Sequence, residues 1–434
     1  MNIRLPYGLE TSPVDVPDNW INGRCYRTHR FEEAADPRTV LRHALENPDG
    51  GQPFNEIVQN RSNAIIVVDS RFPQMFDDIV PGLLEHIHEH SELEPGDVSI
   101  LLTNSFWNPM DPTEAPKIVP ESILARYDVV MHEPTEEALC QEHGTIGEGV
   151  PFRVNTLYEE ADLKIIVGPV QPDLTLGYVG GRSLIMPGLT HRSTAEQVYS
   201  YKNVAKPTVN YASLRNNPLH RAGLEAQESA GCHFNISPIL TLDRKVSEVY
   251  AGEPGQSFMR AASRVKEQIN VRLKEPMDIA VTCGGGAPWD TTIENVVNAI
   301  AAAVPVLKDG GTIVVAAGLA DGFGPDPLRD IILGSNGPRG FTREFGREDH
   351  FLPGQWIAQR YYQLLMHHEV LIQTDGLTED EVWEAGMTPI PNLQEAIEVA
   401  MMDHGQRCKI CALPDGPFSL ATLQDGDHTT QYHE

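Results

Sequence analysis

The chain has 434 residues, of which 41% are hydrophobic and 22% charged, as in ordinary globular proteins. Its 61 acidic residues outnumber 33 basic ones and give a formal net charge of -28, which argues against nucleic-acid and membrane partners because phosphate binding rests on Lys and Arg. No apolar run approaches the roughly 18 residues of a membrane span, and the first residues do not resemble a secretory signal. We therefore expect a cytoplasmic protein of two or three domains.

Short apolar runs rich in β-branched residues recur along the chain and predict strands. They are residues 63–68, 97–102, 128–131, 163–168, 233–240, 278–286 and 311–318. Helix-like segments separate several of them, including 75–92 and 290–310, and the second of these begins with Asp290 as a plausible N-cap. This alternation predicts an α/β protein with parallel sheets and ligands at the carboxyl ends of strands.

A domain boundary is expected near residues 270–277, where a basic amphipathic helix over 258–278 gives way to a new strand and a glycine-rich turn. The expected division is an N-terminal α/β domain of residues 1–272 and a smaller C-terminal α/β domain of residues 273–407. Residues 408–434 are expected to supply a strand that returns to the first domain, followed by a tail.

Polar residues that follow predicted strands are the first candidates for a site. VVDSRFP places Asp69, Ser70 and Arg71 at the end of one strand, where an α/β sheet presents its ligand contacts. An arginine there suits a carboxylate or a phosphate through two parallel hydrogen bonds, although a surface salt bridge is the alternative. His132 follows another strand and suits a ligand, a base or a capping residue equally well.

Three further motifs have open interpretations. CGGGAPWD (283–290) is either a backbone cradle for an anion or a tight turn, and it lacks the GxGxxG spacing of a dinucleotide site. HIHEH (86–90) looks like a metal cluster, but alternate residues do not share a helix face, so we interpret it as a solvated surface. In GYVGGRSLIMPGLTHRS (177–193), glycines allow close approach of backbone to a ligand.

Taken together, these stretches resemble one family, the nickel-pincer lactate racemases or LarA-like proteins. The matching segments lie in order along nearly the whole chain: DSR (69–71), NPM (108–110), HEP (132–134), EEADLKIIVG (159–168), GYVGGRSLIMPG (177–188), NNPLHRAGLEAQESAG (216–231), GGGAPWD (284–290), GGTIVVAAGLADGFG (310–324) and GQWIAQ (354–359). The resemblance implies a two-domain α/β LarA-like fold with parallel-rich sheets and the site in the interdomain cleft. It also implies a racemase or epimerase, an isomerase acting on a small anionic 2-hydroxy acid or sugar acid.

The family's chemistry moves a hydride between the substrate and a nickel-pincer nucleotide, with two histidines as bases, a third as nickel ligand and a lysine as the tether. By this resemblance, Trp107 and Asp173 occupy the two base positions, Tyr199 the nickel-ligand position and Ser183 the lysine position, with His191 as an alternative ligand nearby. Tryptophan cannot accept a proton, and a phenol poorly replaces imidazole on nickel. The sequence therefore predicts one-sided proton chemistry or a different reaction in the same cleft.

The resemblance assigns candidate roles to specific residues. The catalytic candidates are Asp173, Tyr199 and His132; the substrate-binding candidates are Arg71, Trp107, Asn295, Asn298 and Trp356; the cofactor-facing candidates are Asp69, Ser70, Gly180, Gly181, Arg182 and Ser183. No metal ligand is assigned. Three functions stay open: the racemase or epimerase, a cofactor-free lyase or hydrolase in the same cleft, and a non-catalytic binder of a small anion.

Overall fold

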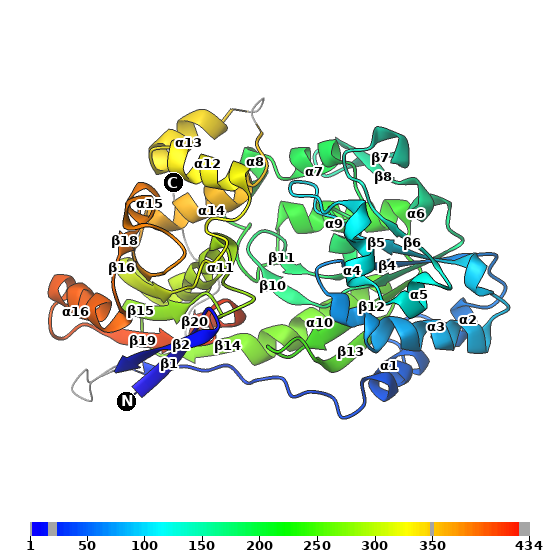
Figure 1. The fold of residues 1–434 in the computed structure, drawn as a ribbon, viewed down its shortest axis with the longest axis horizontal. Helices are drawn as coiled ribbons and strands as arrows, with labels where there is room; N and C mark the ends of the chain where they lie inside the picture. Colours follow the sequence, from blue (N-terminus) through cyan, green and yellow to red (C-terminus); the bar gives the residue numbers. More distant parts are fainter. Residues whose placement is uncertain (1, 16–23, 348–350, 425–434) are drawn as a thin grey trace.

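The structure is a computed structural model and describes residues 2–15, 24–347 and 351–424 (Figure 1). Two six-stranded sheets lie side by side, each packed against helices. Every strand predicted from an apolar run is present: β4 Ala64–Val68, β5 Val98–Leu102, β6 Asp128–Met131, β9 Leu163–Val167, β12 Phe234–Leu240, β15 Met277–Cys283 and β16 Leu307–Ala316. The predicted α/β class with parallel-rich sheets is confirmed.

The first sheet has the strand order β13-β12-β9-β4-β5-β6, in which β13 is Val246–Gly252. Its strands are parallel except for the β12–β13 pair. In β4, Ile65 and Val67 belong to the core that extends into the second half, whereas Ile66 and Val68 belong to the core beneath α1 and α3. Successive side chains of a strand point to opposite faces, so a strand buried on both faces is apolar throughout.

The second sheet has the strand order β18-β17-β16-β15-β19-β3 and is parallel throughout. Its remaining strands are β3 Arg24–Cys25, β17 Glu369–Gln373, β18 Thr388–Pro389 and β19 Ile410–Leu413. Residues 409–414, which were expected to return to the first domain, form β19, and this strand pairs with β15 on one side and with β3, from residues 1–272, on the other. All four residues of β19 are buried, which suits an interior position in a parallel sheet.

The helix expected over residues 258–278 is shorter than predicted. Helix α10 spans Pro254–Ile269, and the backbone then becomes β14, Asn270–Leu273. Strand β14 pairs in parallel with β20, Leu420–Leu423. Val271 and Leu273 are buried in a core cluster that also contains residues of β15. These tertiary contacts favour a strand here, although the sequence pattern was compatible with a longer helix.

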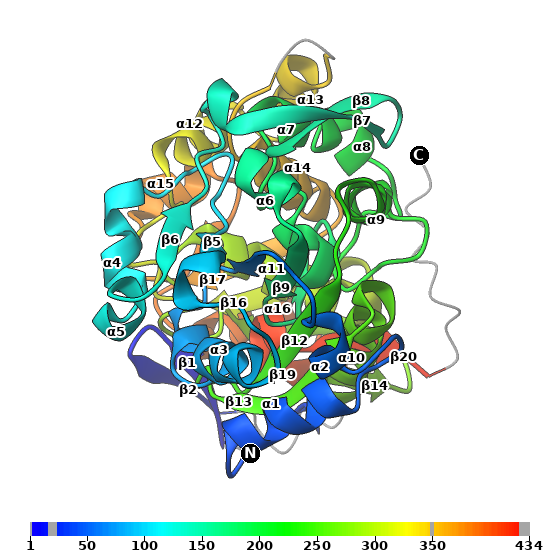
Figure 2. The same ribbon diagram turned by 90° about the vertical axis from the view of Figure 1, so that its right-hand side faces the viewer.

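Helices cover both sheets (Figure 2), and among the described residues none is long and apolar enough to cross a membrane. They are α1 Pro37–Glu46, α2 Phe54–Ile57, α3 Ile79–His90, α4 Ala115–Ile118, α5 Glu121–Leu124, α6 Thr156–Glu160, α7 Arg192–Val198, α8 Tyr201–Val204, α9 Pro218–Ala230, α10, α11 Ile293–Ala303, α12 Asp326–Gly334, α13 Pro338–Phe345, α14 Gln355–Leu365, α15 Glu379–Glu384 and α16 Leu393–His404. Three short antiparallel pairs complete the fold: β1 Asn2–Tyr7 with β2 Glu10–Asp15, β7 Cys140–Ile146 with β8 Val150–Asn155, and β10 Gln171–Asp173 with β11 Gly177–Val179.

The turn of the β1–β2 hairpin fills the glycine-rich end of β15. Gly8 donates its N–H to Asp290 Oδ2 at 2.9 Å and accepts a hydrogen bond from the N–H of Ala287 at 2.7 Å. Asp290 is therefore not the N-cap of α11, a position that Thr292 occupies. Because a Cβ on Gly286 would lie 2.8 Å from Pro6, this turn packs against the hairpin and is a structural turn, not a free anion cradle.

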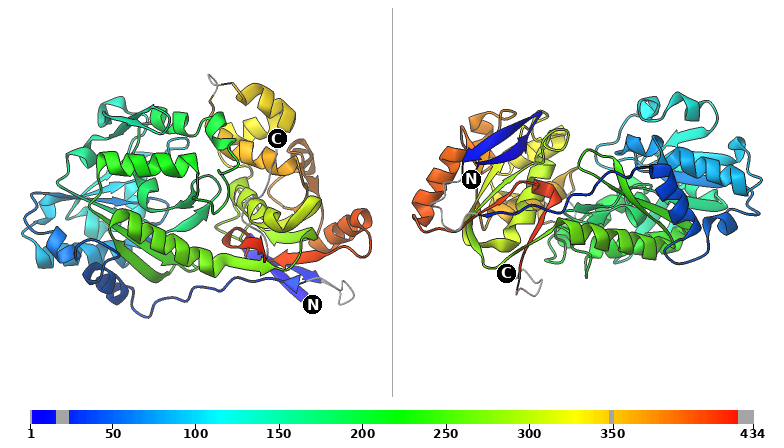
Figure 3. Two further views of the ribbon diagram at one scale, coloured as in Figure 1. Left: turned by 180° about the vertical axis from the view of Figure 1, so that it is seen from behind. Right: turned by 90° about the horizontal axis from the view of Figure 1, so that it is seen from below.

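The two halves are connected by more than the helix–strand crossing at α10 and β14. Figure 3 shows the segment between β3 and α1 running along the molecule from the second sheet to the first. The β10–β11 hairpin lies between the halves, near α11 (Figure 1). The core that contains Val67 of β4 also contains Ile313 of β16, so one continuous apolar cluster spans both sheets.

Candidate active site at the junction of the two halves

Arg71 is held in an orientation that leaves part of its guanidinium accessible. It follows β4, and its Nε and Nη2 donate to Oδ1 and Oδ2 of Asp69 at 2.9 and 2.7 Å. Asp69 is buried, while 57% of the Arg71 side chain is exposed. Ser70 is also buried, and its N–H donates to Thr103 Oγ1. Because Asp69 uses one edge of the planar fork, the Nη1 edge can bind the carboxylate of a ligand.

Two more carboxyl groups act electrostatically on Arg71. Local desolvation lowers the pKa of Arg71, but the charges of Asp69, Asp173 and Glu294 outweigh this effect and raise that pKa. In Glu294, whose side chain is exposed in the first turn of α11, local desolvation of the carboxyl and the charge of Asp173 raise the pKa to about 7, against the opposing effect of Arg71. We call these four electrostatically coupled groups, one cation and three carboxyls, the cluster.

Asp173 ends β10 and is fixed through one oxygen. Its Oδ1 accepts hydrogen bonds from the N–H and Oγ1 of Thr175 at 2.8 and 3.0 Å and from the N–H of Leu176 at 2.6 Å. All three hydrogen bonds from the described part of the chain go to Oδ1. The other oxygen, Oδ2, is thus left to accept a proton or a hydrogen bond from a ligand.

Aromatic rings from both halves line the same region. The Tyr199 and Trp356 ring centroids are 5.1 Å apart, and those of Trp107 and Trp356 are 5.4 Å apart, both edge to face. Phe106 stacks on Trp356 at 4.9 Å. Burial, reinforced by the charge of Asp173, raises the pKa of Tyr199, so its phenol stays protonated. These rings form an apolar wall beside the charged cluster.

Asn295 and Asn298 lie one turn apart on α11 and bond to each other. Asn298 Nδ2 donates to Asn295 Oδ1 at 3.0 Å, and Asn295 Nδ2 donates to the carbonyl oxygen of Trp289 at 2.7 Å. Asn298 Oδ1 is buried and has no hydrogen-bond partner. An unpaired buried amide oxygen is costly, so this atom is suited to receive a donor from a ligand.

His132 does not join the cluster. It is fully buried, its Nε2 donates to the carbonyl oxygen of Thr190 at 3.1 Å, and its Nδ1 accepts from Asn155 Nδ2 at 3.1 Å. Burial lowers its pKa to about 4, so the ring stays neutral. With both nitrogens engaged, His132 bridges β6 and the start of α6 and has neither an open nitrogen nor an accessible face for a substrate.

The loop that contains Gly180–Ser183 is bonded to itself. Arg182 is fully buried and donates to His220 Nδ1 at 2.7 Å and to the carbonyl oxygens of Tyr178, Leu176 and Gly180 at 2.9, 3.1 and 3.3 Å. Ser183 Oγ accepts from the N–H of Gly180 at 2.8 Å. Arg182 was expected to face a cofactor, and in the structure these donors bind the carbonyls of its own loop and His220 instead.

The two glycines of that loop are needed for packing. Gly180 and Gly181 have φ values of 94° and 53°, which L side chains rarely adopt. A Cβ on Gly180 would lie 2.8 Å from the carbonyl oxygen of Pro169, and a Cβ on Gly181 would lie 2.9 Å from the Phe258 ring. The close approach that the glycines allow is therefore to the protein's own backbone and core.

We expect Arg182→Leu to lower the free energy of unfolding by about 3–5 kcal/mol, because it leaves three backbone carbonyls and His220 without their donor and removes the guanidinium from the Phe258 ring, 4.1 Å away. Urea denaturation followed by circular dichroism measures this change. The matched control is Arg192→Leu, which breaks only a surface pair with Glu196 and is expected to shift stability by less than about 1 kcal/mol. Equal effects of the two substitutions would contradict the structural role of Arg182.

Glu294 is the member of the cluster that the sequence did not indicate, although the two asparagines on the same helix were predicted. It lies four residues before Asn298, on the same helical face, but this spacing alone does not mark a site residue. An open hollow between the segment Thr28–Phe31 and the end of β12 is also lined by Gln171 and Pro172, which precede Asp173. Neither Arg71 nor Glu294 lines that hollow, so it is separate from the cluster.

Comparisons with known proteins agree over most of the chain. Residues 7–208 match the lactate racemase N-terminal domain, and residues 273–420 match the lactate racemase C-terminal domain. Lactate racemase of Thermoanaerobacterium thermosaccharolyticum is 28% identical over 96% of this chain and 98% of its own length, and that of Lactiplantibacillus plantarum is 27% identical over 95% and 98%.

Solved structures with a similar fold include a lactate racemase. The lactate racemase apoprotein from T. thermosaccharolyticum superposes with a TM-score of 0.90, at 27% identity, over 97% of this chain and 100% of that one. A Thermotoga maritima protein with a TM-score of 0.62 and 15% identity, matched over 91% of this chain and 100% of that one, shares the fold alone. The chain belongs to the lactate racemase family, a family of isomerases.

Proposed function

We propose that this protein is a racemase or epimerase that inverts a stereocentre of a small 2-hydroxy acid or sugar acid. The observation that carries the proposal is the guanidinium of Arg71, which buried Asp69 holds by one edge while the other edge stays accessible. A fork held in this way is ready to bind a carboxylate through two parallel hydrogen bonds. Relatives named as lactate racemases support the substrate class.

In the proposed reaction, Asp173 and Glu294 move the protons. Asp173 Oδ2 takes the proton from the α carbon, the electron pair of the broken C–H bond moves toward the carboxylate held by Arg71, and Glu294 returns a proton to the opposite face. Glu294 suits this role because its pKa is raised to about 7, and a bound carboxylate nearby would favour its protonated form further. In the reverse direction the two carboxyls exchange roles.

The junction does not fit the nickel-pincer nucleotide that the family implies. Ser183 offers no amine for the tether, and its Oγ is engaged by the N–H of Gly180. Tyr199 is held protonated among aromatic rings, and the Nδ1 of His191 caps the first turn of α7 through Ser193. Among the described residues, the one group of three metal-binding side chains lies on α3, away from the junction. We therefore propose that the reaction runs without this cofactor.

A lyase is the second candidate, and one observation favours it. Glu294, with a pKa of about 7, is an acid suited to protonate a departing hydroxyl group, while Asp173 removes a proton from the neighbouring carbon. The same two groups would then expel water from a sugar acid. Hydrolysis and simple anion binding would use fewer of the groups described, since neither requires both the acid Glu294 and the base Asp173.

The test is to incubate the purified protein in deuterated water with a panel of single-enantiomer 2-hydroxy acids and sugar acids. We expect the opposite stereoisomer to appear with one deuterium on the inverted carbon, as read by chiral chromatography and mass spectrometry. Inversion without deuterium would indicate hydride transfer and overturn the proton mechanism. Loss of water would indicate the lyase, and binding without turnover would indicate the anion binder.

The cofactor is tested separately by producing the protein together with enzymes that make the pincer nucleotide. We expect an unchanged intact mass and no visible absorption band, because Ser183 and Tyr199 supply neither tether nor nickel ligand. A stoichiometric visible chromophore would contradict the cofactor-free proposal.

A further inference from the structure

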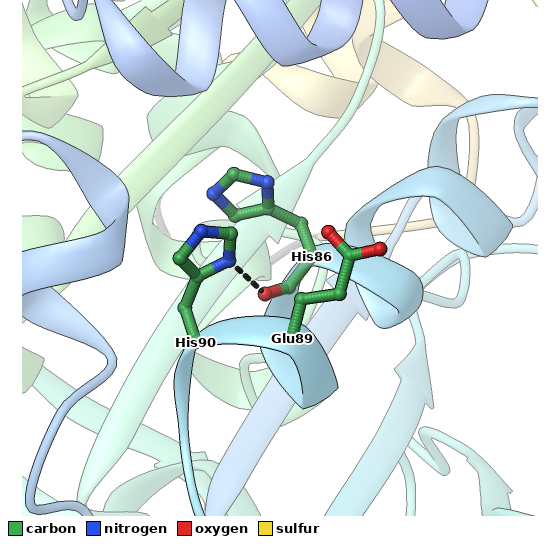
Figure 4. Close-up of side chains that lie close together, drawn as sticks. All are labelled: His86, Glu89 and His90. Atoms are coloured by element: carbon green, nitrogen blue, oxygen red, sulfur yellow. Dashed lines mark hydrogen bonds between the residues drawn. The ribbon is translucent and has the colours of Figure 1, made fainter.

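Three side chains at the end of α3 lie close together and have no part in the proposed reaction. His86 and His90 are one helical turn apart, and their rings stack with centroids 4.2 Å apart and an interplanar angle of 26° (Figure 4). One ligand atom from each of His86, Glu89 and His90 lies within 4.8 Å of the other two. Histidines at positions i and i+4 of a helix are a known arrangement for holding one metal ion.

His86 carries an unpartnered nitrogen in a buried position. The side chain is 4% exposed, and its Nε2 is buried with no hydrogen-bond partner. A buried polar atom without a partner is costly, and an imidazole nitrogen in this state is either strained or awaiting a ligand.

His90 is already oriented as metal-binding histidines usually are. Its Nδ1 lies 2.9 Å from the carbonyl oxygen of His86, drawn as the dashed line in Figure 4. A carbonyl oxygen only accepts hydrogen bonds, so Nδ1 carries the hydrogen and Nε2 of the neutral ring carries the lone pair. Backbone carbonyls orient metal-bound histidines in this way and fix their tautomer.

The surroundings allow an ion to enter and partly balance its charge. A small surface hollow between α1 and α3 is lined by both His86 and Glu89. Glu46 and Glu89 act on His86 as negative charges, and Arg42 acts as a positive one. The exposed carboxylate of Glu89, which Figure 4 shows beside the two rings, is the group free to turn toward an ion.

His88 lies apart from the other two. Its Nδ1 is 2.7 Å from the carbonyl oxygen of Leu93, and its Nε2 is 2.9 Å from the hydroxyl of Tyr127, so both nitrogens are engaged. The interpretation of HIHEH as solvated surface is therefore wrong for His86, which is buried. It is right that alternate residues do not share a helix face, but His86 and His90 are four apart and do.

This group is distinct from the junction site. Helix α3 connects the parallel neighbours β4 and β5, so it runs opposite to them. Its last turn accordingly lies toward the edge of the sheet where the strands begin, whereas Arg71 lies at the edge where β4 ends.

We propose that His86, His90 and Glu89 form a binding site for one divalent transition-metal ion. Two imidazole nitrogens and a carboxylate oxygen, with remaining positions left to water, are a donor set that Zn²⁺, Ni²⁺ and Cu²⁺ accept and that Mg²⁺ and Ca²⁺ do not favour. The ion would supply the missing partner of His86 Nε2 and fix the last turn of α3. The site does not depend on the proposed isomerase reaction.

The experiment uses the full chain, freed of metal by chelator dialysis and titrated with Zn²⁺ at neutral pH. We expect one equivalent to bind in the wild type and the apparent Tm to rise with Zn²⁺. We expect His90→Gln and His86→Gln each to weaken Zn²⁺ binding at this site by at least about tenfold, because each removes one ligand. Glu89→Gln is expected to weaken it by less. If His86→Gln does not fold, the His90→Gln variant, whose substituted residue is only half-buried, tests Zn²⁺ binding in the same way.

The matched control is His88→Gln, which changes a histidine of the same helix but is expected to leave Zn²⁺ binding unchanged. Co²⁺ in place of Zn²⁺ shows the ligand type. Cys408 and Cys411 are free cysteines three positions apart, and their thiolates would add an intense near-ultraviolet band that imidazoles do not. Equal weakening by His88→Gln and His90→Gln, an unaltered affinity in His90→Gln, or a thiolate band for the strongest site would each overturn the proposal.

Discussion

Replacing Arg71 with lysine is expected to lower kcat/KM for a hydroxy-acid substrate by about 100-fold, equivalent to about 2.7 kcal/mol. The wild-type guanidinium binds Asp69 with Nε and Nη2 and still presents its Nη1 edge. A lysine ammonium has no planar fork, so it cannot hold Asp69 and a substrate carboxylate in fixed geometry at the same time. Steady-state kinetics should show the larger part of the loss in KM, and calorimetry should show weaker binding of unreactive carboxylates.

Arg264→Lys is the matched control for this substitution. Arg264 also forms a fork, with Nε and Nη2 donating to Glu248 at 3.0 and 2.8 Å, but it lies on α10 away from the junction. We expect its kinetics to equal those of the wild type. If Arg71→Lys binds carboxylates as well as Arg264→Lys does, Arg71 is a structural ion pair and the proposed substrate site is wrong.

The position of Arg71 could be predicted because it depends on local pattern and simple topology. The apolar run of β4 identifies a buried strand, and a residue just after a parallel strand lies at the ligand-binding edge of the sheet. Only the structure shows that Asp69 is the partner that orients the guanidinium.

Glu294 could not be predicted as a site residue, because the property that marks it comes from distant neighbours. In the sequence it is one acidic residue in the first turn of a helix, where acidic residues are common. Its raised pKa arises from local desolvation of the carboxyl and from the charge of Asp173, which is more than 100 positions earlier in the chain. No local pattern carries that information.

His132 and Arg182 are the opposite case: sequence pattern suggested them as site residues, but the structure shows their polar atoms bonded within the protein. Each is a polar residue at a strand end or in a glycine-rich loop, a position typical of ligand contacts. The partners that engage them, such as Asn155 for His132 and His220 for Arg182, are 23 and 38 residues away. Sequence pattern predicts where polar side chains are useful, but whether a donor is still free depends on tertiary hydrogen bonds.

Trp107 and Tyr199, which the family resemblance predicts to stand at histidine positions, are integrated into the packing of the junction. A Cβ on Gly354 would lie 3.2 Å from the Trp107 ring, so the start of α14 is fitted around that tryptophan. Tyr199 packs against both Phe106 and Trp356. A histidine at either position would leave a void and a buried polar ring. Proton transfer is therefore assigned to the carboxyls of Asp173 and Glu294.

Replacing Glu294 with glutamine is expected to lower kcat/KM by about 10²- to 10⁴-fold, the usual contribution of one acid or base, and to change its pH dependence. Glu294 is protonated below its raised pKa of about 7, so its function as an acid is present below that pH and lost as the pH rises through it. We expect kcat/KM of the wild type to fall above about pH 7. In the substrate complex, the bound carboxylate favours the protonated acid further, so kcat should fall at higher pH than kcat/KM does.

Glutamine cannot ionise, so the alkaline fall should be missing from the residual activity of Glu294→Gln. Stability gives a second readout that does not depend on the reaction. Because the folded protein holds this proton to higher pH than the unfolded chain, Glu294 makes the free energy of unfolding decrease as the pH rises from about 4.5 to about 7. That part of the decrease should be absent in Glu294→Gln and present in the control Glu398→Gln, whose carboxyl lies exposed on α16. An unchanged alkaline limb in Glu294→Gln would show that another group donates the proton, even if the overall rate had fallen.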